Sequence, residues 1–224
     1  YRSILALAVP GALAYALMAT EGQIVNVLLK GVEHAKESIA AYAIYHRVYQ
    51  FVVMPAIACA VAMLPYAARR FGEKDVDGMR RGLREALVAG VAYCAIAAPI
   101  LFFGAPAIAA QFANEAVTRS YAAFAVKLVP LGALVSLPLF LCRPMFEGMG
   151  RGKPGLAMAL FRYVGLTAPT AIAGTWIART AGAPGLYGLV LGLMAATAVA
   201  SAANSGSSCT TGPTSFRPGT SSAK

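Results

Sequence analysis

The chain has 224 residues, of which 58% are hydrophobic and only 12% are charged, and its mean hydropathy is +0.65. Soluble domains carry about 25% charged residues, so this composition excludes an ordinary soluble protein and predicts one that sits in a lipid bilayer. The net charge of +10 does not indicate a nucleic-acid partner, because the cations stand between apolar runs, as they do in membrane topology.

Six apolar runs along the chain are each long enough to cross the hydrocarbon core as a helix. In that core every backbone polar group must be paired internally, so runs of this length form helices. The sequence therefore predicts an all-α integral membrane protein. The predicted spans, which make one domain over residues 1–204, are 4–29, 40–66, 86–111, 121–142, 156–178 and 184–203.

The cations of the loops are unevenly shared between the two sides of the membrane. If the spans alternate, the cation-rich loops 67–85 and 143–155 lie on one side, together with Arg2. The opposite side carries Lys30, Lys36, Arg119 and Arg179. Because the cation-rich side of a bacterial-type inner membrane protein faces the cytoplasm, we predict a multi-pass plasma (inner) membrane protein with a cytoplasmic C-terminus.

The two ends of the chain differ in character. Residues 205–224 read SGSSCTTGPTSFRPGTSSAK, and this Ser, Thr, Gly and Pro composition predicts a disordered tail. At the other end, the chain enters an apolar span within a few residues of Tyr1. We expect it to be part of something longer.

Polar side chains interrupt the first span in the stretch TEGQIVNVLLK, which contains Glu21, Gln23 and Asn26. An ionisable group inside a membrane costs several kcal/mol and marks a functional site by default. Glu21 is therefore a candidate to exchange a proton or bind a cation. The alternative is a structural carboxyl that pairs with a neighbouring helix or lies near the headgroups.

Near the start of the second span, Arg47 has two interpretations. It snorkels to the interface, or it pairs with Glu21 across two antiparallel helices. Gln50, one turn further on, would line the same cavity. The candidate cation- or substrate-binding residues are thus Glu21, Gln23, Asn26, Arg47 and Gln50.

Other patterns favour a transporter over an enzyme. Prolines inside several spans predict bent helices of the kind that surround transporter cavities. Gly188 and Gly192 have the GxxxG spacing that permits close helix packing. The sequence shows no Ser/His/Asp set and no metal-ligand cluster, so it predicts neither an enzyme nor a metal site, and no cofactor.

Two stretches resemble the multidrug and toxic compound extrusion (MATE) family of secondary transporters. One is ESIAAYAIYHRVYQFVVMPAIACAVAMLPYAARRFGEKDVDGMRRG, residues 37–82, with F-x-x-MP followed by a cationic G-E-x-D-x-x-G turn. The other is FEGMGRGKPGLAMALFRYVGLTAPTAIAG, residues 146–174. Their order and spacing are similar to one six-helix lobe of that family, and the resemblance covers about residues 4–200.

The resemblance implies the C-terminal lobe, helices seven to twelve, of a twelve-helix transporter. It implies export of organic cations and other amphipathic compounds, driven by Na⁺ or H⁺, with the N-terminal lobe and the lipid bilayer as partners. Some members have a cation-site glutamate in the seventh helix, where Glu21 is the candidate, one turn further from Pro10 than in the family. Some also have an aspartate in the tenth helix, and residues 121–142 here contain no Asp or Glu.

Two alternatives remain open. A related lipid-linked oligosaccharide flippase would have a cavity richer in cations, whereas the spans here offer mainly Arg47 and Lys127. A non-transporting membrane subunit would show no ion-coupled flux and no need for Glu21.

Overall fold

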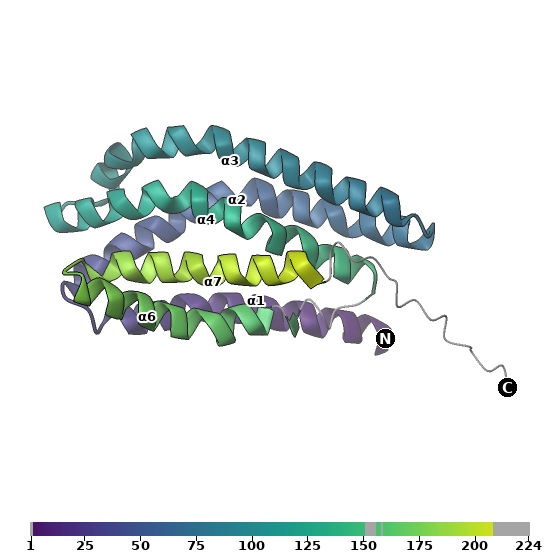
Figure 1. The fold of residues 1–224 in the computed structure, drawn as a ribbon, viewed down its shortest axis with the longest axis horizontal. Helices are drawn as coiled ribbons and strands as arrows, with labels where there is room; N and C mark the ends of the chain where they lie inside the picture. The colour runs from purple at the N-terminus through teal and green to yellow at the C-terminus, as the bar shows by residue number, and fades with distance from the viewer. Residues whose placement is uncertain (1, 151–155, 158, 208–224) are drawn as a thin grey trace.

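The computed structural model describes residues 2–150, 156–157 and 159–207, and its elements are all helical (Figure 1). The predicted all-α fold is confirmed for these residues. The elements are α1 (Arg2–Leu29), α2 (Ala35–Gly72), α3 (Val76–Phe112), α4 (Ala116–Gly148), η1 (Phe161–Leu166), α6 (Thr167–Thr180) and α7 (Gly185–Ser207).

Four stretches are long and apolar enough to cross a membrane: α2, α3, α4 and Gly185–Ala203 of α7. Helices α2, α3 and α4 run beyond the predicted spans at both ends, because the polar residues that flank an apolar core can continue its helix into water. The spans predicted at 4–29 and 156–178 stay predictions. Helix α7 continues to Ser207, three residues into the segment predicted as disordered from residue 205; the rest of that segment, 208–224, lies outside the described residues.

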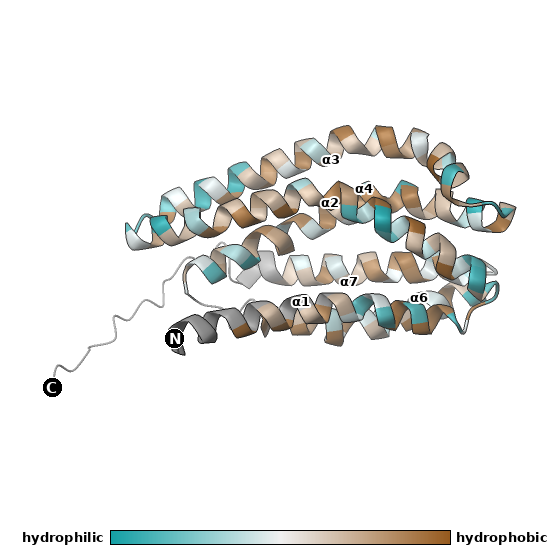
Figure 2. Cartoon of the chain, turned by 180° about the vertical axis from the view of Figure 1, so that it is seen from behind, coloured by the Kyte–Doolittle hydropathy of each residue, from teal (hydrophilic) through white to brown (hydrophobic). Residues whose placement is uncertain are grey.

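The helices form two groups that pack together. Figures 1 and 2 show α2, α3 and α4 on one side of the bundle and α1, α6 and α7 on the other, with α4 in contact with both α2 and α7. The start of α1, the α2–α3 turn and the ends of α4 and α7 lie at one end of the bundle (right in Figure 1). Successive long helices therefore run in alternating directions, as the predicted distribution of loop cations assumes.

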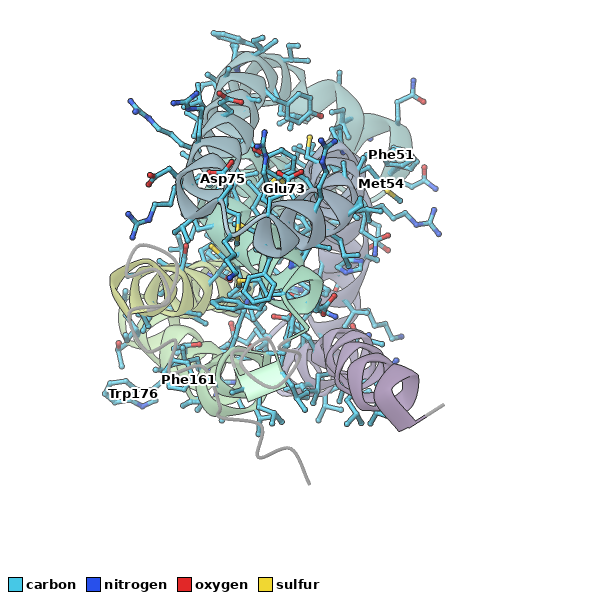
Figure 3. The ribbon with its side chains drawn as sticks, turned by 90° about the vertical axis from the view of Figure 1, so that its right-hand side faces the viewer. Phe51, Met54, Glu73, Asp75, Phe161 and Trp176 are labelled. Carbon is cyan, nitrogen blue, oxygen red and sulfur yellow. The ribbon has the colours of Figure 1, made fainter. Side chains whose placement is uncertain are left out.

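The outside of the bundle is apolar over much of its length, which suits contact with lipid. Figure 3 shows Phe51 and Met54 on α2, and Phe161 and Trp176 on the opposite group, all pointing away from the bundle. Phe51 is 80% exposed and Trp176 is 66% exposed. In Figure 2 the hydrophilic residues gather mostly toward the ends of the long helices. The protein is therefore a multi-pass membrane protein by its surface as well as by its composition.

Glycines let α6 and α7 approach closely. A Cβ added at Gly188 would collide with the backbone of Gly174, and one added at Gly192 would collide with the backbone of Thr170. The close packing predicted from the spacing of Gly188 and Gly192 is confirmed, and it places α7 firmly against α6.

The fifth predicted span is not one regular α-helix. Residues Phe161–Leu166 form a π-helix, η1, in which the Thr167 N–H donates to the Arg162 carbonyl. Such an i to i−5 turn adds a residue to the turn and changes which side chains face inward, and it occurs often at functional sites. Here Arg162 and Tyr163, which lie in η1, are both buried.

The turn between α2 and α3 is fixed by one aspartate. Asp75 Oδ1 accepts the Gly78 N–H at 2.8 Å, which caps the N-terminus of α3, and Asp75 Oδ2 lies 2.7 Å from Arg70 Nη1. This N-cap completes the cationic turn that follows the second predicted span.

We expect Asp75→Ala to lower the free energy of unfolding by about 1–2 kcal/mol, because it removes the cap and a half-exposed ion pair. Asp75→Asn keeps a cap acceptor and should cost about half as much. Thermal unfolding of the purified protein in detergent measures both. Equal losses of unfolding free energy in the two variants would show that the ion pair, and not the cap, is responsible.

Candidate functional site

A small, partly open cavity lies where α1, α2, α4, η1 and α7 meet, and α3 contributes no residue to its lining. Its volume is about 70 Å³, which is room for a few water molecules. Four tyrosines, one glutamate and one arginine lie along its wall, with a half-buried histidine, an exposed glutamine and apolar side chains. The polar groups of this cavity come from helices that are far apart in the sequence.

The tyrosine wall of the cavity is one face of α2. Tyr42, Tyr45 and Tyr49 recur at helical spacing, with His46 one turn after Tyr42, so they share a face. The ring centroids of Tyr45 and Tyr49 are 6.0 Å apart and stacked, and those of Tyr42 and Tyr45 are 5.9 Å apart. This face gives the cavity aromatic rings that also carry hydroxyl groups.

A short hydrogen-bond chain ties this wall to α4. Ser136 Oγ donates to the Gly132 carbonyl at 2.7 Å, and Tyr49 Oη lies 2.8 Å from Ser136 Oγ. Because the serine proton is used on the carbonyl, the Tyr49 hydroxyl is the donor to Ser136. Gly132 adds no side chain to this wall, and a Cβ there would make an ordinary contact, 3.6 Å from the Tyr45 hydroxyl.

Glu21 brings the carboxylate to the cavity from α1. It lies roughly two helical turns, about 12 Å, before Leu29 at the end of α1, and its side chain is 17% exposed. Its Oε1 is 3.5 Å from Arg162 Nη2 and 3.5 Å from Thr167 Oγ1. The carboxylate therefore faces a cation and a hydroxyl that both belong to the fifth predicted span.

Arg162 is held from several sides. Its Nε and Nη2 donate to Thr197 Oγ1 at 3.3 and 3.1 Å, and its guanidinium carbon lies 4.4 Å from the centre of the Tyr163 ring. Thr197 Oγ1 is free to accept because its own proton is donated to the Leu193 carbonyl at 2.9 Å. With a side chain only 9% exposed, Arg162 needs these partners to offset the loss of water.

Glu21 and Arg162 together make the cavity formally neutral. A buried pair of this kind is weak evidence for stability, because desolvation of both charges offsets their attraction. Removal of one partner, however, leaves an uncompensated charge inside the span. Among the described residues, no group of three His, Cys, Asp or Glu side chains lies together, so the cavity offers a single carboxylate for a ligand.

Of the five binding residues predicted from the sequence, only some line the cavity. Glu21 and Gln50 line the cavity, whereas Gln23, Asn26 and Arg47 do not. The hypothesis that Arg47 pairs with Glu21 is wrong: Glu21 pairs with Arg162, and Arg47 is exposed on a different face of α2 from the tyrosines. A ligand-binding role for any of the five stays a prediction.

Sequence reasoning missed Arg162 and the tyrosine face. Arg162 lies inside an apolar run, where the rule that selected Glu21 applies equally. The tyrosines were visible as three aromatic residues at helical spacing on the second span. Two ionisable residues inside apolar runs, together with an aromatic face on the second span, were the sequence pattern that indicated this site.

The MatE family model matches residues 10–173. Among curated proteins, none matches the sequence. The family match includes the stretch that carries Glu21, the tyrosine face and Arg162.

Three similar solved structures have the same fold. One is an outward-facing multidrug resistance MATE family transporter of the MOP superfamily, with 19% identity and a TM-score of 0.81 over 90% of this chain and 44% of that one. A MOP superfamily transporter from Pyrococcus furiosus, described as having a binding pocket of reverse polarity that suggests a different function, has the same identity, TM-score and coverage.

The third is a variant of the Vibrio cholerae MATE transporter VcmN, with 18% identity and a TM-score of 0.80 over 89% of this chain and 44% of that one. This chain therefore spans less than half the length of these proteins. Its fold is that of one of their six-helix lobes.

Proposed function

Because the chain belongs to the MatE family, we propose that it forms the C-terminal half of a secondary antiporter that exports organic cations and other amphipathic compounds in exchange for Na⁺ or H⁺. The observation that supports this most directly is the Glu21 carboxylate, which faces Arg162 in a partly open cavity between the helices. A carboxylate in this place is costly to keep without a function.

The size of the cavity favours the coupling cation, and not the exported compound, as its ligand. Cavities that hold drug-sized ligands are about 300–1,000 Å³, and this one is about 70 Å³. The exported compound would therefore bind between this lobe and the N-terminal lobe, while the small cation binds within this one. Rocking of the two lobes would alternate access to both sites.

The same proposal includes an orientation in the plasma (inner) membrane. Arg69 and Arg70 lie in the last turn of α2, and Lys74 follows in the α2–α3 turn, at the same end of the bundle as the end of α7. Under the positive-inside rule this end faces the cytoplasm. The C-terminus would then be cytoplasmic.

The flippase alternative requires a cation-rich cavity, and the structure places Arg162 in the cavity but neither of the two cations expected from the sequence. Arg162 adds a cation to the cavity, but Glu21 neutralises it. Arg47 and Lys127 do not line the cavity, and Lys127 Nζ lies 5.1 Å from the centre of the Phe102 ring. No observation therefore favours an anionic lipid-linked substrate in this cavity over a cation.

The test is ion-driven flux by the full-length protein in proteoliposomes. Tetraphenylphosphonium, a lipophilic organic cation, serves as substrate, and a Na⁺ gradient or a pH gradient is imposed. We expect tetraphenylphosphonium movement that depends on one of the two gradients. No dependence on either gradient would support the non-transporting subunit instead.

We expect Gly132→Leu to reduce this flux by roughly tenfold, because a leucine side chain would fill the space beside Tyr45 and Met194. Gly132→Ala is the matched control, since its Cβ would make only ordinary contacts, 3.6 Å from the Tyr45 hydroxyl. Equal flux in both variants, at equal membrane abundance, would show that the cavity is not used in transport.

A further inference from the structure

Arg162 has two kinds of partner, and they compete for the same guanidinium. On one side is the Glu21 carboxylate, with Nη2 and Oε1 3.5 Å apart. On the other side are neutral groups, the Thr197 hydroxyl and the Tyr163 ring. The same Nη2 atom serves both Glu21 and Thr197.

The distances show which side holds the guanidinium more closely. The contacts with Thr197 Oγ1, at 3.1 and 3.3 Å, are at or near ordinary hydrogen-bond length, whereas 3.5 Å to Glu21 is a loose ion-pair contact. The backbone of η1 fixes the origin of the side chain, and Tyr163 covers its flat face. Arg162 can therefore give up Glu21 and keep most of its contacts.

Glu21, in turn, has little else to satisfy it. Its other described contact is Thr167 Oγ1, and that hydroxyl also lies 3.0 Å from the Arg162 carbonyl. A hydroxyl has one proton to donate, so Thr167 cannot serve both acceptors at once. A cation that arrives at Glu21 thus meets a carboxylate whose main partner is Arg162.

From this geometry we propose that Arg162 is a tethered competitor for the coupling cation. It contacts Glu21 when the cavity is empty, and it releases the carboxylate and keeps Thr197 and Tyr163 when a small monovalent cation, Na⁺ or a proton, binds Glu21. This inference rests on the proposed antiport. It makes Arg162 and Thr197 positioning residues that set how tightly the driving cation binds.

The other groups around the pair do not replace Arg162 in this role. Helix α2 presents Tyr42, Tyr45, Tyr49 and His46, α4 presents the uncharged Gly132 and Phe140, and α7 presents Leu193, Met194 and Thr197. The next charged side chain on α4, Arg143, is paired with Glu147 at 2.9 Å. Arg162 is the cation in contact with Glu21 among the described residues.

Two variants should shift the concentration of driving cation required for half-maximal flux in opposite directions. Arg162→Gln removes the competitor, so the concentration of driving cation that gives half-maximal tetraphenylphosphonium flux should fall by roughly tenfold. Thr197→Val removes the neutral partner, so the guanidinium stays on Glu21 and that concentration should rise by roughly fivefold. Arg162→Lys, which keeps a cation, should remain within about threefold of the parent protein.

These values come from NaCl titrations at fixed pH and from pH titrations without Na⁺, on the full-length protein in proteoliposomes. A structural role for Arg162 would lower protein abundance or maximal flux in all variants without this opposite shift. Shifts of the same sign in Arg162→Gln and Thr197→Val, or no shift in either, would overturn the proposal.

A second measurement does not need transport. Dicyclohexylcarbodiimide modifies protonated carboxyl groups in apolar surroundings, and mass spectrometry of the Glu21 peptide quantifies it. We expect labelling to increase in Arg162→Gln and decrease in Thr197→Val relative to the parent protein. The reverse order, or equal labelling, overturns the competition whatever the flux. The predicted labelling with no ion-driven flux would keep the competition and reject the antiport.

Discussion

Glu21→Gln should reduce ion-driven tetraphenylphosphonium flux by the full-length protein by roughly 10- to 100-fold, with membrane abundance near normal. The substitution is nearly isosteric, so packing around α1 is kept, and Arg162 retains its contacts with Thr197 and the Tyr163 ring. It removes the carboxylate of the Glu21–Arg162 pair, and the cavity then has no anionic group with which to attract a cation. The measurement is the initial flux at saturating gradient, normalised to the amount of protein in the membrane.

Glu33→Gln is the matched control for this substitution. Glu33 is an exposed acid in the turn after α1 and does not line the cavity. Its flux should equal that of the parent protein. Full activity of Glu21→Gln at normal abundance would remove Glu21 from the mechanism.

Among the glycines that the structure describes, Gly188 should be the one at which substitution by Ala is most destabilising. The added Cβ would collide with the backbone of Gly174 and with Ala178 Cβ, and a backbone neighbour cannot rotate out of the way. Helices α6 and α7 would have to separate, at a cost of about 1–3 kcal/mol or more. Thermal unfolding in detergent should show a midpoint lower by about 3–10 °C.

Gly104→Ala is the control for this test. Gly104 lies in α3, and its added Cβ would come no closer than 3.9 Å to any neighbouring atom. We expect its unfolding midpoint to stay within about 2 °C of the parent protein. A Gly188→Ala protein as stable as Gly104→Ala would contradict the close approach of α6 and α7.

The fold could be predicted from the sequence because the lipid bilayer excludes most backbone structures other than helices. A long apolar run must become a helix, and a count of such runs gives the topology. The ends were less readable: α2 was expected to end at residue 66 and continues to Gly72, because Arg69 and Arg70 are good helix formers outside the apolar core. The π-helix η1 has no comparable sequence signal.

The site was readable only in part. Glu21 stands out because any carboxylate inside a span is costly, but its partner depends on how each helix is rotated about its axis. Arg162 lies near the start of the predicted span 156–178, where a long cation commonly snorkels to the interface. It is instead buried in η1 and donates to Thr197, 35 residues later in the chain. Local sequence rules do not reach such a contact.

The most direct test of the account is to measure both fluxes at once. Full-length protein in proteoliposomes is loaded with tetraphenylphosphonium, and its efflux is recorded together with the uptake of Na⁺ or H⁺. Antiport through Glu21 predicts opposite fluxes that rise and fall together in the parent protein and disappear together in Glu21→Gln. Efflux without cation uptake, or coupled fluxes that persist in Glu21→Gln, would contradict it.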